Sequence, residues 1–259
     1  EYYALGIEAA GKVIGDPNYR LVASPEEVCT EVLPGNSEEG IFEVCYDDSR
    51  GEYKDFGSYI GGTVEKWPVL KGTTPASRRK FFIRNETVER LYTPEDLRLQ
   101  AYFADFFRMK EEPVSVTQGA AYVRMWREVE YYSGGIYDGT PRTLLANDIL
   151  IRLPDILLLR AEMKAATGDR EGAVADLDVV RRRAGVAGYS EAEGDLRRAI
   201  QLERDRELLF QTGVRYFDYM RNHTYNLLKG GFRDLTETDV AAGALFLPVS
   251  LDAMNNNPK

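Results

Sequence analysis

Two glutamates spaced one helical turn apart are the residues of this chain that most resemble a catalytic pair. Glu203 and Glu207 lie in a segment whose apolar spacing predicts a helix from Leu196 to near Gly213. A pair of carboxylates is sufficient for the acid and base steps of glycoside hydrolysis, and Glu162 would add a third ligand for a metal ion. The surrounding residues decide between this chemistry and a structural role.

Arginines cluster around the two glutamates. A positive neighbour lowers the pKa of a carboxyl group, which is unfavourable for a general acid at neutral pH. Glu207 shares a helical face with Leu196, so we expect it to be buried, and a buried carboxylate needs a partner. The candidate partners close the preceding helix, flank Glu207 or follow it: Arg181, Arg182, Arg183, Arg204, Arg206, Arg215 and Arg221. We therefore predict a network of charges between helices and no catalytic residue.

Other chemistries find little support in the sequence. His223 is the single histidine, so no Ser/His/Asp set, Cys/His set or histidine-rich zinc site can be built on other histidines, and we expect a surface or supporting role for it. Neither of the two glycine-rich nucleotide-binding patterns occurs. The net charge of −9 is unfavourable for binding a phosphate backbone. We expect no nucleic-acid partner, no cofactor and no metal.

The two cysteines, Cys29 and Cys45, have no neighbours at metal-ligand spacing. A disulfide between them is one alternative if the chain is extracytoplasmic. We favour two free, buried thiols, since a reduced cysteine behaves as a small apolar side chain.

Two stretches without regular periodicity, 47–75 and 131–139, are rich in glycine and aromatic residues. A long irregular loop inside a compact domain is usually functional or disordered, and the aromatic content argues against simple disorder. Flat rings with a polar edge suit the faces of sugar rings. The ligand-binding candidates are Tyr59, Trp67, Tyr131, Tyr132 and Tyr137, with Trp126 as the weakest further candidate. The alternative is that these large rings belong to the core.

Three helical segments between Ile151 and Arg221 form the framework of the chain. Pro154 suits the first turn of the first helix, because the N–H that proline lacks would be unpaired there. Gly168 and Asp169 then supply a left-handed stop and the N-cap of the second helix. The short connections predict antiparallel helix pairs in an α-hairpin array.

Shorter elements make up the first half of the chain. Apolar spacing predicts a helix over residues 3–14. The N-cap Ser24, Pro25 at the first helical position and the acidic residues after it predict a second, short helix toward Leu33. Residues 41–46 are typical of a mostly buried strand. The aromatic run 101–107 is expected to be buried, with residues 122–126 as its strand partner.

Several motifs, in matching order and spacing, resemble those of one protein family over nearly the whole chain. They are Tyr19-Arg20-Leu21, 38–44, Arg152-Leu153-Pro154, Ala161-Glu162, 178–185, 203–208, 213–218 with Arg221, 245–249 and Asn257-Pro258. The family that they resemble is SusD/RagB. One departure lies at Gln211-Thr212-Gly213, where that family usually has a Glu-Gly pair.

The resemblance implies a mainly α fold. In this fold, tetratricopeptide-like helix pairs form an α-α superhelix with long loops and a few short strands, as in SusD-like proteins. The resemblance also implies a single SusD/RagB-like domain over residues 1–259. We expect this chain to lack the N-terminal part of the family, with its signal peptide, lipidated cysteine and further helical repeats.

The function that the resemblance implies is that of a non-catalytic binding protein, lipid-anchored and surface-exposed on the cell outer membrane of Bacteroidetes-type bacteria. Such a protein captures a glycan, an oligosaccharide or another nutrient for import through a SusC-like TonB-dependent transporter. Membrane contact would be made only through a lipid anchor absent from this chain. A helical-repeat adaptor that binds a peptide or protein partner is the alternative from another class. A carbohydrate-active enzyme is a third.

Overall fold

The computed structural model describes residues 1–46, 83–112, 119–121, 123–125, 147–211, 214–227 and 235–245. The chain forms two compact units, Glu1–Thr212 and Gly213–Lys259, and each is described by itself. Within the described ranges, no helix combines the length and the apolar character needed to cross a membrane.

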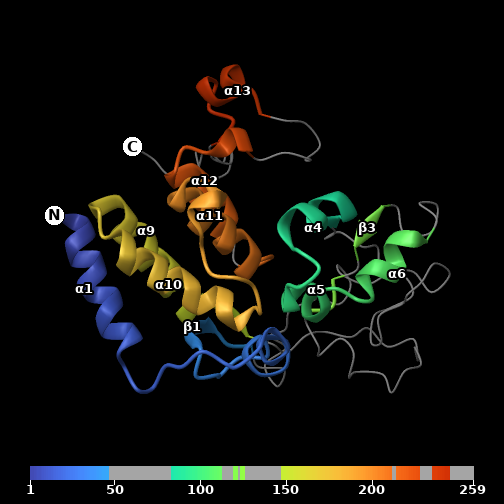
Figure 1. Cartoon of the computed structure of the whole chain (residues 1–259), viewed down its shortest axis with the longest axis horizontal. Helices are drawn as coiled ribbons and strands as arrows, with labels where there is room; N and C mark the ends of the chain where they lie inside the picture. The colour runs from blue at the N-terminus through green and yellow to red at the C-terminus, as the bar shows by residue number, and fades with distance from the viewer. Residues whose placement is uncertain are drawn as a thin grey trace, which may run out of the picture. The chain divides into compact units, whose positions relative to one another are not determined.

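Three helices of the first unit, α9 (Leu153–Thr167), α10 (Arg170–Arg183) and α11 (Leu196–Glu207), pack as the predicted array, and a fourth, α1 (Tyr2–Ile14), lies against α9. α10 lies against α9, and α11 packs on both α9 and α10 (Figure 1). The inner faces of α9, α10 and α11 share an apolar core: Leu153, Leu157, Leu158, Ala161, Ala173, Leu177, Val180, Leu196, Ala199 and Ile200. Packing of this kind supplies most of the stability of helices of such length. The predicted three-helix framework is confirmed.

The turn between α9 and α10 has the predicted geometry. Gly168 adopts a φ of +90°, in the left-handed region that glycine favours. The Asp169 carboxylate accepts a hydrogen bond from the Gly172 N–H at 3.0 Å and so caps α10. These features end one helix and begin the next within two residues.

Replacing Gly168 by alanine is therefore expected to lower the free energy of unfolding by about 1 kcal/mol, because a Cβ is unfavourable at positive φ. The matched control is Gly11→Ala in α1, where the added Cβ would meet Arg160 Nη1 at an ordinary 3.7 Å. The control variant should gain roughly 0.5–1 kcal/mol, because alanine is the better helix former. Urea unfolding measures both shifts, and shifts of the same sign would contradict the prediction.

Two strands far apart in the sequence form an antiparallel pair. β1 (Gly40–Val44) pairs with β4 (Asp148–Arg152), so that Val44 lies opposite Asp148. β4 leads directly into α9. The chain between the two strands, residues 45–147, therefore begins and ends beside the β1–β4 pair.

Two predictions are wrong in this pair of strands. Ile151 and Arg152, placed at the start of the helical framework, belong to β4, because pairing with β1 outweighs their local helical spacing. Residues 41–46 are not mostly buried. Phe42 and Val44 are 56% and 42% exposed, because a two-stranded sheet leaves much of its surface uncovered.

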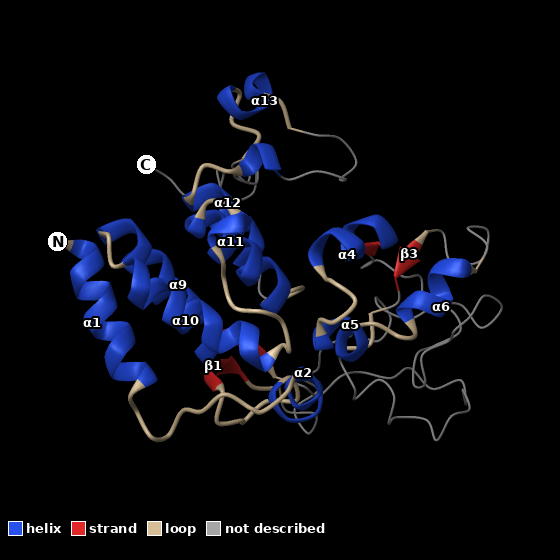
Figure 2. Cartoon of the chain, viewed as in Figure 1, coloured by secondary structure: helices blue, strands red, loops and turns tan. Residues whose placement is uncertain are grey.

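A second apolar core lies in the first unit, apart from the core of the array. Its elements are α2 (Pro25–Glu27), the π-helical turn η1 (Val28–Val32), β2 (Ile83–Arg84), α4 (Asn85–Leu91), α5 (Leu97–Tyr102), α6 (Phe106–Glu111) and β3 (Ala120–Ala121). Of these, α2, α4, α5, α6 and β3 are labelled in Figure 2. Ser24 caps α2 by accepting a hydrogen bond from the Glu27 N–H at 3.2 Å. The predicted short helix after Ser24 is thus confirmed.

The aromatic run at the end of α5 is buried as predicted, with one exception. Tyr102, Phe103 and Phe106 are at most 5% exposed, whereas Phe107 is 52% exposed. Phe103 forms an antiparallel bridge with Val123, which confirms the predicted partner segment.

Both cysteines are free. Cys29 is buried in η1, and its thiol donates a weak hydrogen bond to the Ala101 carbonyl at 3.6 Å. Cys45 is exposed just beyond β1, so the prediction of a buried thiol is wrong at this position. The reason is the same as for its neighbours, because the end of this strand lies open to solvent.

The described part of the second unit consists of short helices: α12 (Val214–Arg221), the 3-10 turn η4 (Tyr225–Leu227) and α13 (Glu237–Ala241). Arg221, a candidate partner of Glu207, pairs instead with Asp218 at 2.7 Å within α12. His223 follows α12 and is exposed, in agreement with a surface position.

Candidate functional site

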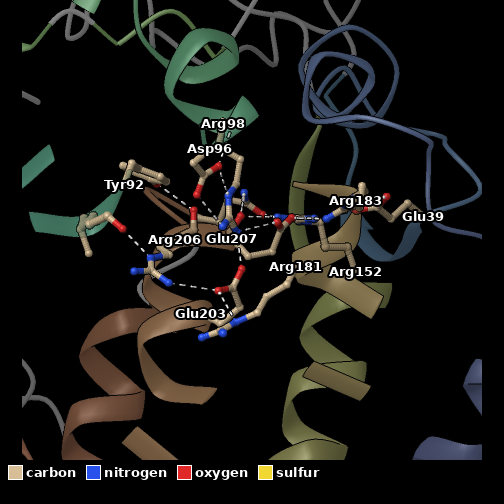
Figure 3. A network of polar contacts seen from close by, with 12 residues as sticks. Glu39, Tyr92, Asp96, Arg98, Arg152, Arg181, Arg183, Glu203, Arg206 and Glu207 are labelled. Atoms are coloured by element: carbon tan, nitrogen blue, oxygen red, sulfur yellow. Dashed lines mark hydrogen bonds and ion pairs between the residues drawn. The ribbon is translucent and has the colours of Figure 1, made fainter. Parts of the chain in front are cut away.

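Eight buried charged side chains meet in the first unit (Figure 3). Four are carboxylates and four are arginines, and none is more than 8% exposed: Glu39, Asp96, Glu203, Glu207, Arg98, Arg152, Arg181 and Arg183. They come from the approach to β1, the start of α5, the end of β4, the end of α10, and α11. We call these eight residues the charge network. Positive and negative charges balance within it by formal count.

Glu207 lies at the centre of the charge network. Its Oε1 is 2.6 Å from Arg152 Nη1 and accepts a second contact from Arg183 Nη2, while its Oε2 accepts from Arg98 Nη1 at 3.4 Å. Burial would raise the pKa of Glu207, but these arginines together lower the pKa to about 2. Glu207 is therefore ionised at neutral pH and has no proton to give as a general acid.

Arg98 joins carboxylates from two parts of the chain. Its Nε and Nη2 donate to the two oxygens of Asp96 at 2.9 and 2.8 Å, a two-pronged contact that suits the planar guanidinium. Its Nη1 donates to Glu203 Oε1 at 2.6 Å. Burial opposes the charged form of Arg98, yet the surrounding carboxylates raise its pKa well above the usual value, so Arg98 keeps its charge.

Arg152 and Arg183 hold Glu39 between them. Arg152 Nη1 donates to Glu39 Oε1 at 2.6 Å, and Arg183 Nη1 donates to Oε2 at 2.8 Å. The same Oε2 accepts from the Val22 N–H at 3.1 Å. Because both arginines also contact Glu207, Glu39 links the loop before β1 to α10 and α11.

Gln211 completes the surroundings of Arg152. Arg152 Nε donates to Gln211 Oε1 at 2.7 Å. Gln211 follows a turn in which Phe210 has a φ of +58°, an unusual value for a large side chain. This turn ends α11 at Glu207, so the predicted end of the helix near Gly213 is wrong. At the position where the sequence departs from the family motif, the neutral side chain of Gln211 thus accepts a hydrogen bond from Arg152.

Arg181 and Arg206 mark the rim of the charge network. Arg181 Nη1 and Nη2 donate to both oxygens of Glu193 at 2.8 and 2.9 Å, and Arg181 Nε is 3.4 Å from Glu203. The hydrogen bond from Arg181 lowers the pKa of Glu193. Arg206 Nη1 reaches Glu203 Oε2 at 3.3 Å. Glu203 therefore faces three arginines, counting Arg98.

These contacts favour a structural role over catalysis. A glycosidase pair needs one carboxyl group that carries a proton at working pH, whereas the arginines around Glu207 lower its pKa, and Glu203 is held by Arg98 at 2.6 Å. Within the described ranges, no group of three or more His, Cys, Asp or Glu side chains is arranged to hold a metal ion, so Glu162 forms no such site with them. The predicted burial of Glu207 and its pairing with arginines are confirmed, with three arginine partners.

The predicted partners are right in part. Arg183 contacts Glu207, and Arg181 contacts Glu203. Sequence reasoning misses Arg98 and Arg152, which lie far outside the helix that carries Glu207. One local pattern could have indicated Arg98. Asp96, two residues earlier, is the N-cap of a short helix, and this position brings its carboxylate within reach of the Arg98 side chain.

The remaining predicted arginine partners of the first unit contact other groups. Arg204 pairs with Asp155 at 2.7 Å and so joins α11 to α9. Arg206 contacts Glu203 and the carbonyl of Leu91. Arg182 is exposed on α10.

The aromatic candidates for ligand binding all lie outside the described residues. They are Tyr59, Trp67, Tyr131, Tyr132 and Tyr137, together with Trp126. The structure does describe the residues on either side of the two stretches that hold these candidates. Residues 47–82 run from the end of β1 to β2, and residues 126–146 run from beyond β3 to the start of β4.

Comparison with known proteins identifies the family of the chain. Residues 38–259 match the model of the SusD family. The chain belongs to the SusD family. A SusD homologue from Bacteroides thetaiotaomicron VPI-5482 has the same fold, with a TM-score of 0.77 and 23% identity over 99% of this chain and 53% of the other. A SusD superfamily protein from Parabacteroides distasonis ATCC 8503 gives a TM-score of 0.72 and 17% identity over 99% and 56% of the two chains.

A third solved structure of this fold contains a bound sugar. Surface glycan-binding protein A from Bacteroides thetaiotaomicron, in complex with laminarihexaose, gives a TM-score of 0.59 and 20% identity over 95% of this chain and 59% of the other. The SusD-family chain thus spans little more than half the length of these relatives. No protein with a curated description matches its sequence. The predicted mainly helical SusD-like fold is confirmed.

Proposed function

We propose that this chain is part of a non-catalytic, surface-exposed protein that binds a glycan or oligosaccharide. The observation that carries this proposal is the SusD-family match over residues 38–259. Structural relatives that are surface glycan-binding proteins, one of them in complex with laminarihexaose, support a carbohydrate as the ligand. The family match runs through both compact units, so we propose that they belong to a single SusD-like domain.

The partner in this proposal is a SusC-like TonB-dependent transporter, and the glycan is captured for import through it. The protein is held at the outer membrane by a lipid anchor. An acidic chain with a net charge of −9 fits a neutral sugar ligand better than a polyanionic one. The buried charges contact one another at 2.6 Å in several pairs, which supports a role in the fold and leaves ligand contact to other side chains.

A glycan-array screen with laminarihexaose and hexasaccharides of other linkages tests the proposed function. We expect saturable binding of at least one hexasaccharide. If no sugar binds and a peptide library yields a ligand, the helical-repeat adaptor is the better assignment.

Aromatic side chains are expected to carry the affinity. Replacing Trp67 by alanine should weaken binding roughly tenfold or more, because truncated aromatic contacts are among the costliest at binding sites. The same test applies to the other candidates: Tyr59, Tyr131, Tyr132 and Tyr137. The control is Tyr2→Ala, which removes a ring that is 87% exposed on α1. Wild-type affinity in all five variants, or an equal loss of affinity in the control, would contradict this assignment.

A further inference from the structure

Helix α11 borders both apolar cores of the first unit. Leu196, Ala199 and Ile200 lie in the core that α11 shares with α9 and α10. Leu202 and, just beyond the helix, Leu209 pack instead with the second apolar core, to which α4, α5 and α6 contribute. The two cores are therefore separate sets of apolar side chains that meet along one helix.

Arg98 crosses this border. Its backbone belongs to α5, and its fully buried guanidinium donates to Glu203 Oε1 at 2.6 Å and to Glu207 Oε2 at 3.4 Å, both on α11 (Figure 3). Its Nε and Nη2 donate to the two oxygens of Asp96, the N-cap of α5, at 2.9 and 2.8 Å. Arg98 thus ties one carboxylate of the second apolar core to two carboxylates of α11.

The three carboxylates differ in the partners that they keep without Arg98. Glu203 and Glu207 on α11 each contact two further arginines. Asp96 is 2% exposed, and within the described ranges Arg98 is its one cationic partner. A buried carboxylate without a cation is costly. Loosening Arg98 therefore penalises the buried position of α5, whereas the carboxylates of α11 remain paired.

We propose that Arg98 is a latch between the two cores, and that its release lets α4, α5 and α6 open together while α9 and α10 stay folded. The proposal concerns movement within the first unit and does not depend on which ligand the protein binds. Opening brings water to Asp96 and so removes the cost of its burial. Such an opening is local, with one cooperative part of a domain unfolding before the rest.

Other polar contacts between this part of the chain and the array are weaker than the latch. The Leu97 N–H donates to the Ala184 carbonyl at 3.0 Å, and the Tyr92 hydroxyl donates to the Arg206 carbonyl at 2.8 Å. The Arg206 guanidinium donates in turn to the Leu91 carbonyl. Hydrogen bonds that involve ionised groups are roughly twice as strong as those between neutral groups. The latch joins charged groups on both sides and is therefore the strongest of these ties.

The array has its own connections, which do not involve the latch. Arg160 of α9 holds both oxygens of Asp176 of α10, at 2.8 and 2.7 Å. Arg204 of α11 pairs with Asp155 of α9 at 2.7 Å. Together with their shared apolar core, these ion pairs keep α9, α10 and α11 packed when the latch is released.

Cys29 reports directly on the position of α5. Its thiol is fully buried in the second apolar core and contacts the Ala101 carbonyl of α5 at 3.6 Å. Cys45, the other cysteine, is exposed, so Cys45→Ser leaves a single thiol that a reagent reaches only after opening. The rate at which iodoacetamide alkylates Cys29 therefore measures how often the second apolar core opens.

All variants are made in the Cys45→Ser parent. Arg98→Lys keeps the positive charge, but a lysine has one nitrogen and cannot hold both oxygens of Asp96 and both glutamates. Glu203→Gln is a milder second variant, which keeps the shape of the side chain and removes the charge that Arg98 reaches at 2.6 Å. Arg160→Lys is the matched control, since it loosens the same two-pronged contact inside the array.

Alkylation of Cys29 and amide hydrogen exchange are followed below the unfolding transition of every variant. In Arg98→Lys and Glu203→Gln, we expect alkylation of Cys29 and exchange in α4, α5 and α6 to be about tenfold faster than in the parent or more. Exchange in α10 should stay within about twofold of the parent. Arg160→Lys should leave the alkylation of Cys29 within about twofold of the parent.

Each outcome decides the proposal. Unchanged alkylation of Cys29 in Arg98→Lys overturns it. An equal acceleration of exchange in α10 also overturns it, because this would mean a general loss of stability, and so does equally fast alkylation in Arg160→Lys. If Arg98→Lys does not fold, Glu203→Gln alone decides by the same criteria.

Discussion

Replacing Glu207 by alanine is expected to lower the free energy of unfolding by about 3–5 kcal/mol, the usual range when one partner of a buried charge pair is removed. Glu207 is 1% exposed and faces Arg98, Arg152 and Arg183. Without it, the acidic partners that these arginines keep among the described residues are Asp96, Glu39 and Glu203, and the network gains an uncompensated positive charge. Urea unfolding followed by circular dichroism measures the change.

The control for this variant is Glu8→Ala. Glu8 pairs with Lys12 at 2.8 Å on the surface of α1, where the two side chains are 64% and 74% exposed. An exposed pair of this kind contributes at most about 1 kcal/mol, so the control should unfold almost as wild type does. Equal stability of Glu207→Ala and wild type, together with loss of a reaction on carbohydrate, would show that Glu207 is catalytic.

Stability is expected to fall steeply in acid, by about 3 kcal/mol from Glu207 alone. Arginine neighbours lower the pKa of Glu207 from 4.5 in the unfolded chain to about 2 in the fold. A depressed pKa stabilises the fold at every pH above the unfolded value, and this contribution is lost as the pH falls from about 4.5 to about 2. The measurement is the free energy of unfolding at a series of pH values from 6 to 2.

Glu207→Gln isolates the contribution of this one carboxyl group. The variant removes the titrating group while keeping the shape of the side chain, so it should be less stable at pH 6 and lose less stability on acidification. A wild-type curve that is flat between pH 4.5 and 2, or a variant with the same slope, would contradict the assignment.

The charge network is more than a source of stability. Burying charges is costly, and ion pairs in a protein interior often stabilise no better than apolar side chains of the same size. Charged hydrogen bonds hold only in a narrow geometry, so the eight residues of the charge network restrict how the segments that carry them pack together.

Elements with strong local signals could be predicted from the sequence. The turn at Gly168 and Asp169 is fixed by a left-handed glycine and a capping side chain, both of which act over a few residues. The first helix and the cap at Ser24 follow from equally local rules. The burial of Glu207 could be predicted because helical periodicity places it on an apolar face.

Features that depend on distant pairing could not be predicted in the same way. Arg152 has helical neighbours in the sequence, yet β1, more than a hundred residues earlier, draws it into a strand. Arg98 reaches Glu203 across a sequence separation of 105 residues, and no local pattern encodes that contact. The turn that follows α11 contains Phe210 with a φ of +58°, a backbone conformation that a propensity scale does not anticipate.

The most direct test of the proposed function is one calorimetric titration of the intact chain with the hexasaccharide selected by the screen, followed by assay of reducing ends in the same sample. We expect saturable heat of binding and no increase in reducing ends after prolonged incubation. An increase in reducing ends with the pure protein would contradict the assignment as a non-catalytic glycan-binding protein.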